Sequence, residues 1–178
     1  MHRVVVIGVA GAGKSTVARG LSERLGVRHV ELDSIFWQAN WTKLEHGEFE
    51  ARVREATRTG GWVVDGNYSE RIRAIAWGAA DTVVWLDLPR AVVMWQLVLR
   101  TARRIASGAE LWNGNREGSL RDQLSRDPAR SILLWSWRTY GPTKAEYGLA
   151  MRNPEFADLR FVRLRSRREI KRFLRSVL

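Results

Sequence analysis

The sequence contains no cysteine, which excludes disulfides and thiolate metal sites. It also lacks any apolar run of roughly 20 residues, the length that a helix needs to cross a bilayer. Residues 1–3 lead directly into an apolar segment and leave no room for a signal peptide. We therefore expect a cytoplasmic protein with no membrane partner.

Internal repeats and low-complexity linkers are absent as well. A chain of 178 residues, 45% of them hydrophobic, is sufficient for one hydrophobic core but not comfortably for two. We predict a single domain over residues 1–178. Monomer and homodimer both remain open.

Lysine is scarce, with four among the 30 basic residues, yet the formal net charge is +11. A strongly positive chain suits nucleic acid or polyanionic nucleotides as partners. The sequence has no helix-turn-helix, RNA-binding or zinc motif, which makes nucleic acid the less favoured partner.

Apolar β-branched runs alternate with segments of helical periodicity. Strands are predicted at 3–7, 28–32, 62–64, 82–86 and 159–164. Helices are predicted at 14–25, 48–59, 90–105, in segments of 120–150 interrupted at Pro128 and Gly141-Pro142, and after Ser166. This alternation indicates an α/β fold, in which helices cover both faces of a parallel sheet.

Residues 8–15, GVAGAGKS, match the phosphate-loop pattern G-x-x-x-x-G-K-[ST] between a strand and a helix. Glycines let successive backbone N–H groups form a concave anion site, which the helix dipole strengthens. We expect Lys14 to reach the β- and γ-phosphates of ATP and Ser15 to hold Mg²⁺. The predicted nucleotide-binding residues are Gly8, Gly11, Ala12, Gly13, Lys14, Ser15 and Thr16.

Asp65 ends the predicted third strand, beside the phosphate loop in a parallel sheet. A carboxylate at that place can hold a water of the Mg²⁺ shell, so Ser15 and Asp65 are the predicted metal residues. The alternative is an ordinary Asp-Gly turn.

Four segments together carry a family resemblance: GVAGAGKST (8–16), LDSIFWQANW (32–41), WVVDGNYSE (62–70) and DTVVWLDLPR (81–90). Over about its first 100 residues the chain resembles the adenylate kinase-like P-loop small-molecule kinases, and most of all the DNA topology modulation proteins. The resemblance implies a P-loop NTPase three-layer sandwich with a five-stranded parallel sheet. It also implies an acceptor-binding insert at about 34–60 and a small arginine-bearing lid at about 101–118.

The same resemblance implies catalytic roles for Lys14, Asp65, Arg100 and Arg104. The chain departs from the family at position 96, where glutamine replaces the first of two lid arginines spaced four apart. We expect the glycine-rich segment 106–119 to be mobile and to close over bound phosphates.

Polar and aromatic side chains in the 33–68 region are the candidates for acceptor binding. They are Asp33, Phe36, Trp37, Trp41, Asn67 and Tyr68. Asp33 is placed to orient an acceptor hydroxyl, or alternatively to cap the following turn. The aromatic residues form a stacking platform or simply pack the insert. Asp87 is interpreted as structural. A solvated basic edge is predicted for Arg163, Arg165, Arg167 and Arg168, although the resemblance also implies that adenine binds at the turn after the fifth strand.

These features predict a kinase that uses ATP and Mg²⁺ to phosphorylate a small hydroxyl- or phosphate-bearing metabolite, such as a nucleoside or nucleotide. One alternative is an ATP-binding regulator that binds nucleic acid. The other is a GTPase, which the missing base-specificity motif disfavours.

Overall fold

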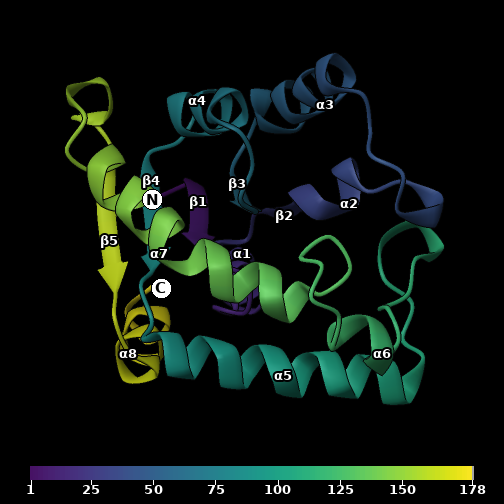
Figure 1. Cartoon of the computed structure of the whole chain (residues 1–178). Helices are drawn as coiled ribbons and strands as arrows, with labels where there is room; N and C mark the ends of the chain where they lie inside the picture. Colours follow the sequence, from purple (N-terminus) through teal and green to yellow (C-terminus); the bar gives the residue numbers. More distant parts are fainter. Residues whose placement is uncertain (178) are drawn as a thin grey trace.

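The computed structural model describes residues 1–177. Its centre is a sheet of five parallel strands in the order β2-β3-β1-β4-β5 (Figure 1). The strands are β1 (Arg3–Gly8), β2 (Arg28–Glu31), β3 (Trp62–Asp65), β4 (Thr82–Leu86) and β5 (Arg160–Leu164). The predicted five-stranded parallel α/β fold is confirmed.

Helices lie on both sides of this sheet. They are α1 (Lys14–Leu25), α2 (Leu32–Phe36), α3 (His46–Arg58), α4 (Glu70–Gly78), α5 (Arg90–Ser107), α6 (Leu120–Gln123), α7 (Ile132–Ala150) and α8 (Arg167–Ser176), with short 3₁₀ turns η1 (Ala39–Trp41), η2 (Trp112–Gly114) and η3 (Pro154–Phe156). Within residues 1–177, none of the helices has the combined length and apolarity that crossing a membrane requires.

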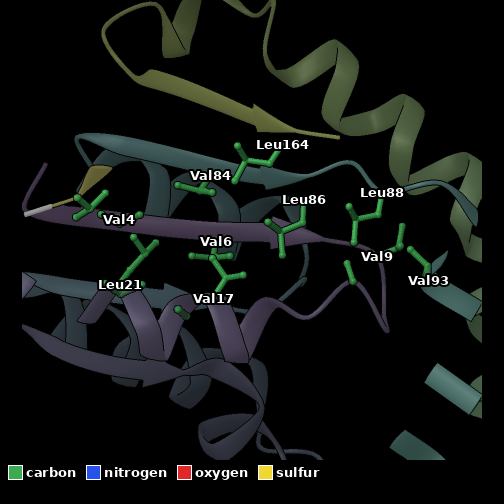
Figure 2. Packing of buried hydrophobic residues seen from close by; sticks show 14 of the residues in the cluster. Val4, Val6, Val9, Val17, Leu21, Val84, Leu86, Leu88, Val93 and Leu164 are labelled. Carbon is green, nitrogen blue, oxygen red and sulfur yellow. The ribbon is translucent and has the colours of Figure 1, made fainter. Parts of the chain in front are cut away.

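The sheet separates two hydrophobic cores. Val4 and Val6 of β1 point to one face, where they pack with Val17 and Leu21 of α1 (Figure 2). Val5 and Ile7 point to the other face, toward the core beneath α3 and α4. Successive side chains of a strand alternate between faces, so a continuous apolar strand is what a parallel sheet covered on both sides needs.

Two local predictions were incomplete or wrong. The predicted break at Gly141-Pro142 is wrong, because α7 runs through it. Packing holds this helix continuous: Tyr140 is buried and its hydroxyl donates to the Leu88 carbonyl at 2.8 Å. The helix α4 was not predicted at all. Pro128 does separate α6 from α7, as expected.

The strand order places the carboxyl ends of three neighbouring strands side by side at one edge of the sheet. β1 ends at Gly8, β2 at Glu31 and β3 at Asp65, and these strands are neighbours. Carboxyl ends of adjacent parallel strands are where α/β proteins bind ligands. The candidate site is built at this edge.

Candidate functional site

The phosphate loop joins β1 to α1. Gly11 and Gly13 have φ angles of 88° and 90°, a left-handed conformation that favours glycine. A Cβ on Gly11 would lie 2.9 Å from the Val93 carbonyl oxygen and from the Leu97 Cβ, so α5 leaves no room for a side chain. No side chain caps the first N–H groups of α1 at Gly13, which leaves them free for an anion.

Lys14 lies back against this loop. Its Nζ donates to the carbonyl oxygens of Gly8 at 3.0 Å and Val9 at 3.3 Å. Burial lowers the pKa of Lys14, while the nearby carboxylates of Asp33 and Asp65 act to raise it. The ammonium group therefore stands among carboxylates, at the mouth of the phosphate loop.

Asp65 at the end of β3 is 2% exposed, and neither of its carboxylate oxygens has a hydrogen-bond partner among the described residues. The nearest cation candidate is Nε2 of His29, 3.5 Å from Oδ1. A buried carboxylate without donors is costly, and such a group in a native fold requires an explanation. A cation or a cation-bound water at this place is such an explanation.

The oxygen atoms around Asp65 fit Mg²⁺. The Ser15 hydroxyl donates to Glu31 Oε1 at 2.9 Å, close to the carboxyl end of β3. Within residues 1–177, no group of three or more His, Cys, Asp and Glu residues is arranged to hold a metal alone. Mg²⁺ binds through few protein oxygens and keeps water and phosphate ligands. The donor set thus suits a magnesium ion that arrives with a nucleotide.

Glu31 was missed by sequence reasoning. The strand prediction ended at residue 32, whereas β2 ends at Glu31 and Asp33 lies in the short helix α2. The available signal was its position at the carboxyl end of a predicted parallel strand, the end at which such sheets bind ligands.

Asp33 is held by Tyr68, whose hydroxyl donates to Oδ1. Burial raises the pKa of Asp33, and the hydrogen bond from Tyr68 and the charge of Lys14 oppose that rise. Burial and the Asp33 charge raise the pKa of Tyr68. Asn67 donates through Nδ2 to the Gly8 carbonyl, and its buried Oδ1 has no partner among the described residues. The structure thus joins these acceptor candidates to the phosphate loop.

Arg100 and Arg104 on α5 approach the same cluster. Burial, followed by the charge of Arg104, lowers the pKa of Arg100, whose charge also acts on Lys14 and Asp33. Arg100 Nε is buried without a partner, whereas Arg104 Nη1 pairs with Glu117 Oε2 at 3.2 Å. Glu117 was not predicted. Their action on phosphate stays a prediction.

The predicted lid segment packs on the predicted acceptor insert. Asn115 of the lid is 4% exposed and donates to the carbonyl oxygens of Gln38 and Trp112, both at 2.8 Å. Its Oδ1 accepts from the Trp41 backbone N–H at 2.7 Å. These contacts join segments about 75 residues apart in the chain. The predicted mobility of 106–119 stays a prediction.

The three aromatic candidates lie together in the insert. The Phe36 ring centre is 5.0 Å from those of both Trp37 and Phe49, and Trp37 is 5.4 Å from Trp41. Trp41 is 38% exposed and donates through Nε1 to the Arg116 carbonyl at 3.1 Å. Their role as an acceptor platform stays a prediction.

Both carboxylate oxygens of Asp87 bind a basic side chain, in contrast to those of Asp65. Arg163 donates to its Oδ2 from Nε at 2.9 Å and from Nη2 at 2.6 Å, and Lys144 Nζ lies 2.8 Å from Oδ1. Arg163 also stacks on Trp85, with the guanidinium carbon 4.3 Å from the ring centre. Arg163 is an exposed residue, as the prediction of a solvated edge requires, but it is also bound to a buried carboxylate.

Comparison with known proteins adds relatives among small-molecule kinases. No protein-family model matches the chain. It is 32% identical to a shikimate kinase from Persephonella marina over 111 residues, 52% of this chain and 65% of that kinase. It is 46% identical to a probable gluconokinase from Schizosaccharomyces pombe over 43 residues, 24% of this chain and 22% of that protein. The chain thus spans less than two thirds of these relatives.

Solved structures share the fold across nearly the whole chain. A gluconokinase from Sinorhizobium meliloti 1021 matches with a TM-score of 0.54 and 16% identity, covering 99% of this chain and 89% of that one. Shikimate kinase from Acinetobacter baumannii in complex with shikimate matches with a TM-score of 0.52 and 14% identity, covering 99% and 90%. Membership of the DNA topology modulation family stays a prediction. The chain has the fold of P-loop small-molecule kinases, and its partial sequence similarity is to proteins of the same kind.

Proposed function

We propose that this protein is a kinase that transfers the γ-phosphoryl group of ATP to a hydroxyl group of a small metabolite. One observation carries the proposal: the buried carboxylate of Asp65, which has no hydrogen-bond partner among the described residues, lies at the same sheet edge as the phosphate loop and Asp33. Phosphoryl transfer needs mainly positioning and charge neutralisation, which such a cluster supplies.

The donor half binds ATP through the phosphate loop. The free N–H groups at the start of α1 bind the phosphates, and Lys14 exchanges its contacts with Gly8 and Val9 for phosphate oxygens. Ser15, with Asp65 through water, would hold Mg²⁺. Held there, Mg²⁺ would neutralise charge on the β- and γ-phosphates.

The acceptor half activates the hydroxyl. Tyr68 occupies Oδ1 of Asp33, which leaves Oδ2 to accept a hydrogen bond from the acceptor. As the hydroxyl oxygen bonds to the γ-phosphorus and the bond to the β-phosphate oxygen breaks, Asp33 takes the hydroxyl proton. Burial raises the pKa of Asp33, which makes it a stronger proton acceptor. Arg100, with a free buried Nε, faces the charge that develops.

A polyhydroxylated acid is the acceptor class that we place first. The names of the relatives refer to shikimate and gluconate, which are both hydroxylated carboxylates. The buried Arg100 and its neighbour Arg104 supply positive charge near Asp33 for such an anion. The nucleoside-like acceptor predicted from sequence is the second class to test.

The test is a screen for metabolite-dependent ADP release, with Mg·ATP and panels of hydroxylated acids, sugars, nucleosides and nucleotides. We expect one class to stimulate release, and Asp33→Asn to abolish the stimulation while the protein still binds ATP. DNA-stimulated release, with no response to any metabolite, would instead favour the regulator. A preference for GTP with hydrolysis alone would favour the GTPase.

A further inference from the structure

Ser136 on α7 reaches across to the phosphate loop. It is 0% exposed, and its Oγ donates to the carbonyl oxygen of Ala10 at 3.0 Å, over a separation of 126 residues in the chain. Serine and threonine inside a helix can instead bond back to a carbonyl of the preceding turn, as Thr139 does with Trp135 at 2.8 Å. A serine hydroxyl has one proton to donate, and Ser136 gives it to the loop.

The group that Ser136 binds belongs to the peptide between Ala10 and Gly11. A trans peptide is planar, so its C=O and N–H point in opposite directions. Because the Ala10 carbonyl is directed at α7, the Gly11 N–H is directed away from α7. Gly11 is buried, yet its N–H has no hydrogen-bond acceptor among residues 1–177. A buried N–H without an acceptor requires an explanation, and a bound anion is one.

Glycine at position 11 leaves this peptide group able to turn over. Gly11 has a φ of 88°, and glycine adopts positive and negative φ about equally well. A reversed peptide would direct the N–H toward α7 and remove it from the anion. No donor to the Ala10 carbonyl other than Ser136 is found in the described part of the chain. The Ser136 hydrogen bond therefore opposes the reversal.

We propose that Ser136 is a positioning residue of the donor site, and that it aims the Gly11 N–H at the phosphate chain of ATP by holding the Ala10 carbonyl. Ser136 itself does not touch the nucleotide. The loop is then ordered before ATP arrives, so that binding does not have to supply the free energy of ordering it. The inference rests on the proposed function, because the anion that reaches the loop is ATP.

Tyr140 provides a matched control on the same helix. It lies one turn after Ser136, is 9% exposed, and its hydroxyl donates to the Leu88 carbonyl at 2.8 Å. This bond holds the connection between β4 and α5 and not the phosphate loop. Ser136→Ala and Tyr140→Phe each remove one buried hydrogen bond from α7 to a backbone carbonyl. Both variants should therefore melt at a lower temperature than wild type.

The experiment measures Mg·ATP binding to the full chain by titration calorimetry, without any acceptor. Ser136→Ala should weaken binding about fivefold, the scale of one neutral hydrogen bond. Tyr140→Phe should bind within about twofold of wild type in spite of its lower melting temperature. In ¹H–¹⁵N NMR spectra, the Gly11 amide proton should move to lower field when Mg·ATP binds to wild type, and it should move less in Ser136→Ala.

Each outcome has a separate meaning. Wild-type protein that binds no Mg·ATP overturns the proposed function and this inference together. Binding that Lys14→Ala weakens, but that Ser136→Ala and Tyr140→Phe affect equally, overturns only the role of Ser136. A Gly11 amide signal that does not move when wild type binds Mg·ATP overturns the inference even if Ser136→Ala fails to fold.

Discussion

The ends of β3 and β4 offer two aspartates that look alike in the sequence and differ in the structure. Asp65 and Asp87 both follow a buried apolar strand and are 2% and 7% exposed. Asp87 binds Arg163 and Lys144, so both its oxygens are satisfied. Asp65 has no hydrogen-bond donor among the described residues. Folding gains nothing from an unsatisfied buried charge, so this difference supports the proposal that Asp65 binds a ligand while Asp87 stabilises the fold.

The largest expected effect is on ATP affinity, and it comes from comparing Lys14, near Asp65, with Lys144, beside Asp87. Lys14→Ala should weaken Mg·ATP binding by about a hundredfold or more, because several charge-assisted contacts to phosphate are lost. The fold should survive, since Lys14 Nζ binds only the Gly8 and Val9 carbonyls. Lys144→Ala, which removes the partner of Asp87, is the control and should leave the affinity unchanged. Titration calorimetry measures the Mg·ATP affinity of both variants. Equal losses of affinity would contradict the assignment of Lys14, and not Lys144, to the nucleotide site.

Asp65→Asn should lower kcat by about a hundredfold while the ATP dissociation constant changes by less than about threefold. The carboxylate matters most when charge develops on the transferring group. The same change should not reduce the free energy of unfolding, because asparagine replaces a buried charge that has no hydrogen-bond partner among the described residues. Steady-state kinetics measures the change in kcat, and denaturant unfolding measures the free energy of unfolding. A kcat within twofold of wild type would make Asp65 structural.

Asp87→Asn should show the opposite behaviour. It breaks a buried pair with Arg163, whose side chain is 34% exposed, and we expect a loss of about 2 kcal/mol in the free energy of unfolding. The ATP affinity of the folded variant should stay near wild type. If this variant instead lost ATP binding without losing stability, the two aspartates would have been assigned the wrong way round.

The smallest effect is on pH dependence. Tyr68→Phe removes the hydrogen bond that opposes the rise in the pKa of Asp33, so this pKa should rise further. A base must be unprotonated to act, and the acidic limb of kcat/KM should therefore move to higher pH. Tyr147→Phe, which removes a buried hydroxyl elsewhere, is the control. An unshifted limb in the Tyr68→Phe protein would exclude Asp33 as the base.

Sequence reasoning succeeded where chemistry is local. The phosphate loop, α1 and all five strands follow from short motifs, because glycine spacing and apolar runs act within a few residues. It assigned Asp65 to a metal and Asp87 to the structure, but it could not name the partners of Asp87, because they lie 57 and 76 residues away in the chain.

The same limit explains the features that sequence missed. In the sequence, Gln96 is only a departure from a family pattern. Its contact with Arg167 joins α5 to α8 and depends on how these two helices meet in the fold. The break predicted at Pro142 was wrong because tertiary packing of α7 outweighs the local cost of proline. Long-range contacts, not residue types, decide these positions.

The most direct test of the account follows the γ-phosphoryl group itself. The protein is incubated with ATP labelled with ¹⁸O in the γ-phosphate and with the acceptor from the metabolite screen, and the products are weighed by mass spectrometry. The account predicts that the label appears in the phosphorylated acceptor and that Asp33→Asn prevents this. Label found only in inorganic phosphate, at a rate that no acceptor changes, would contradict it.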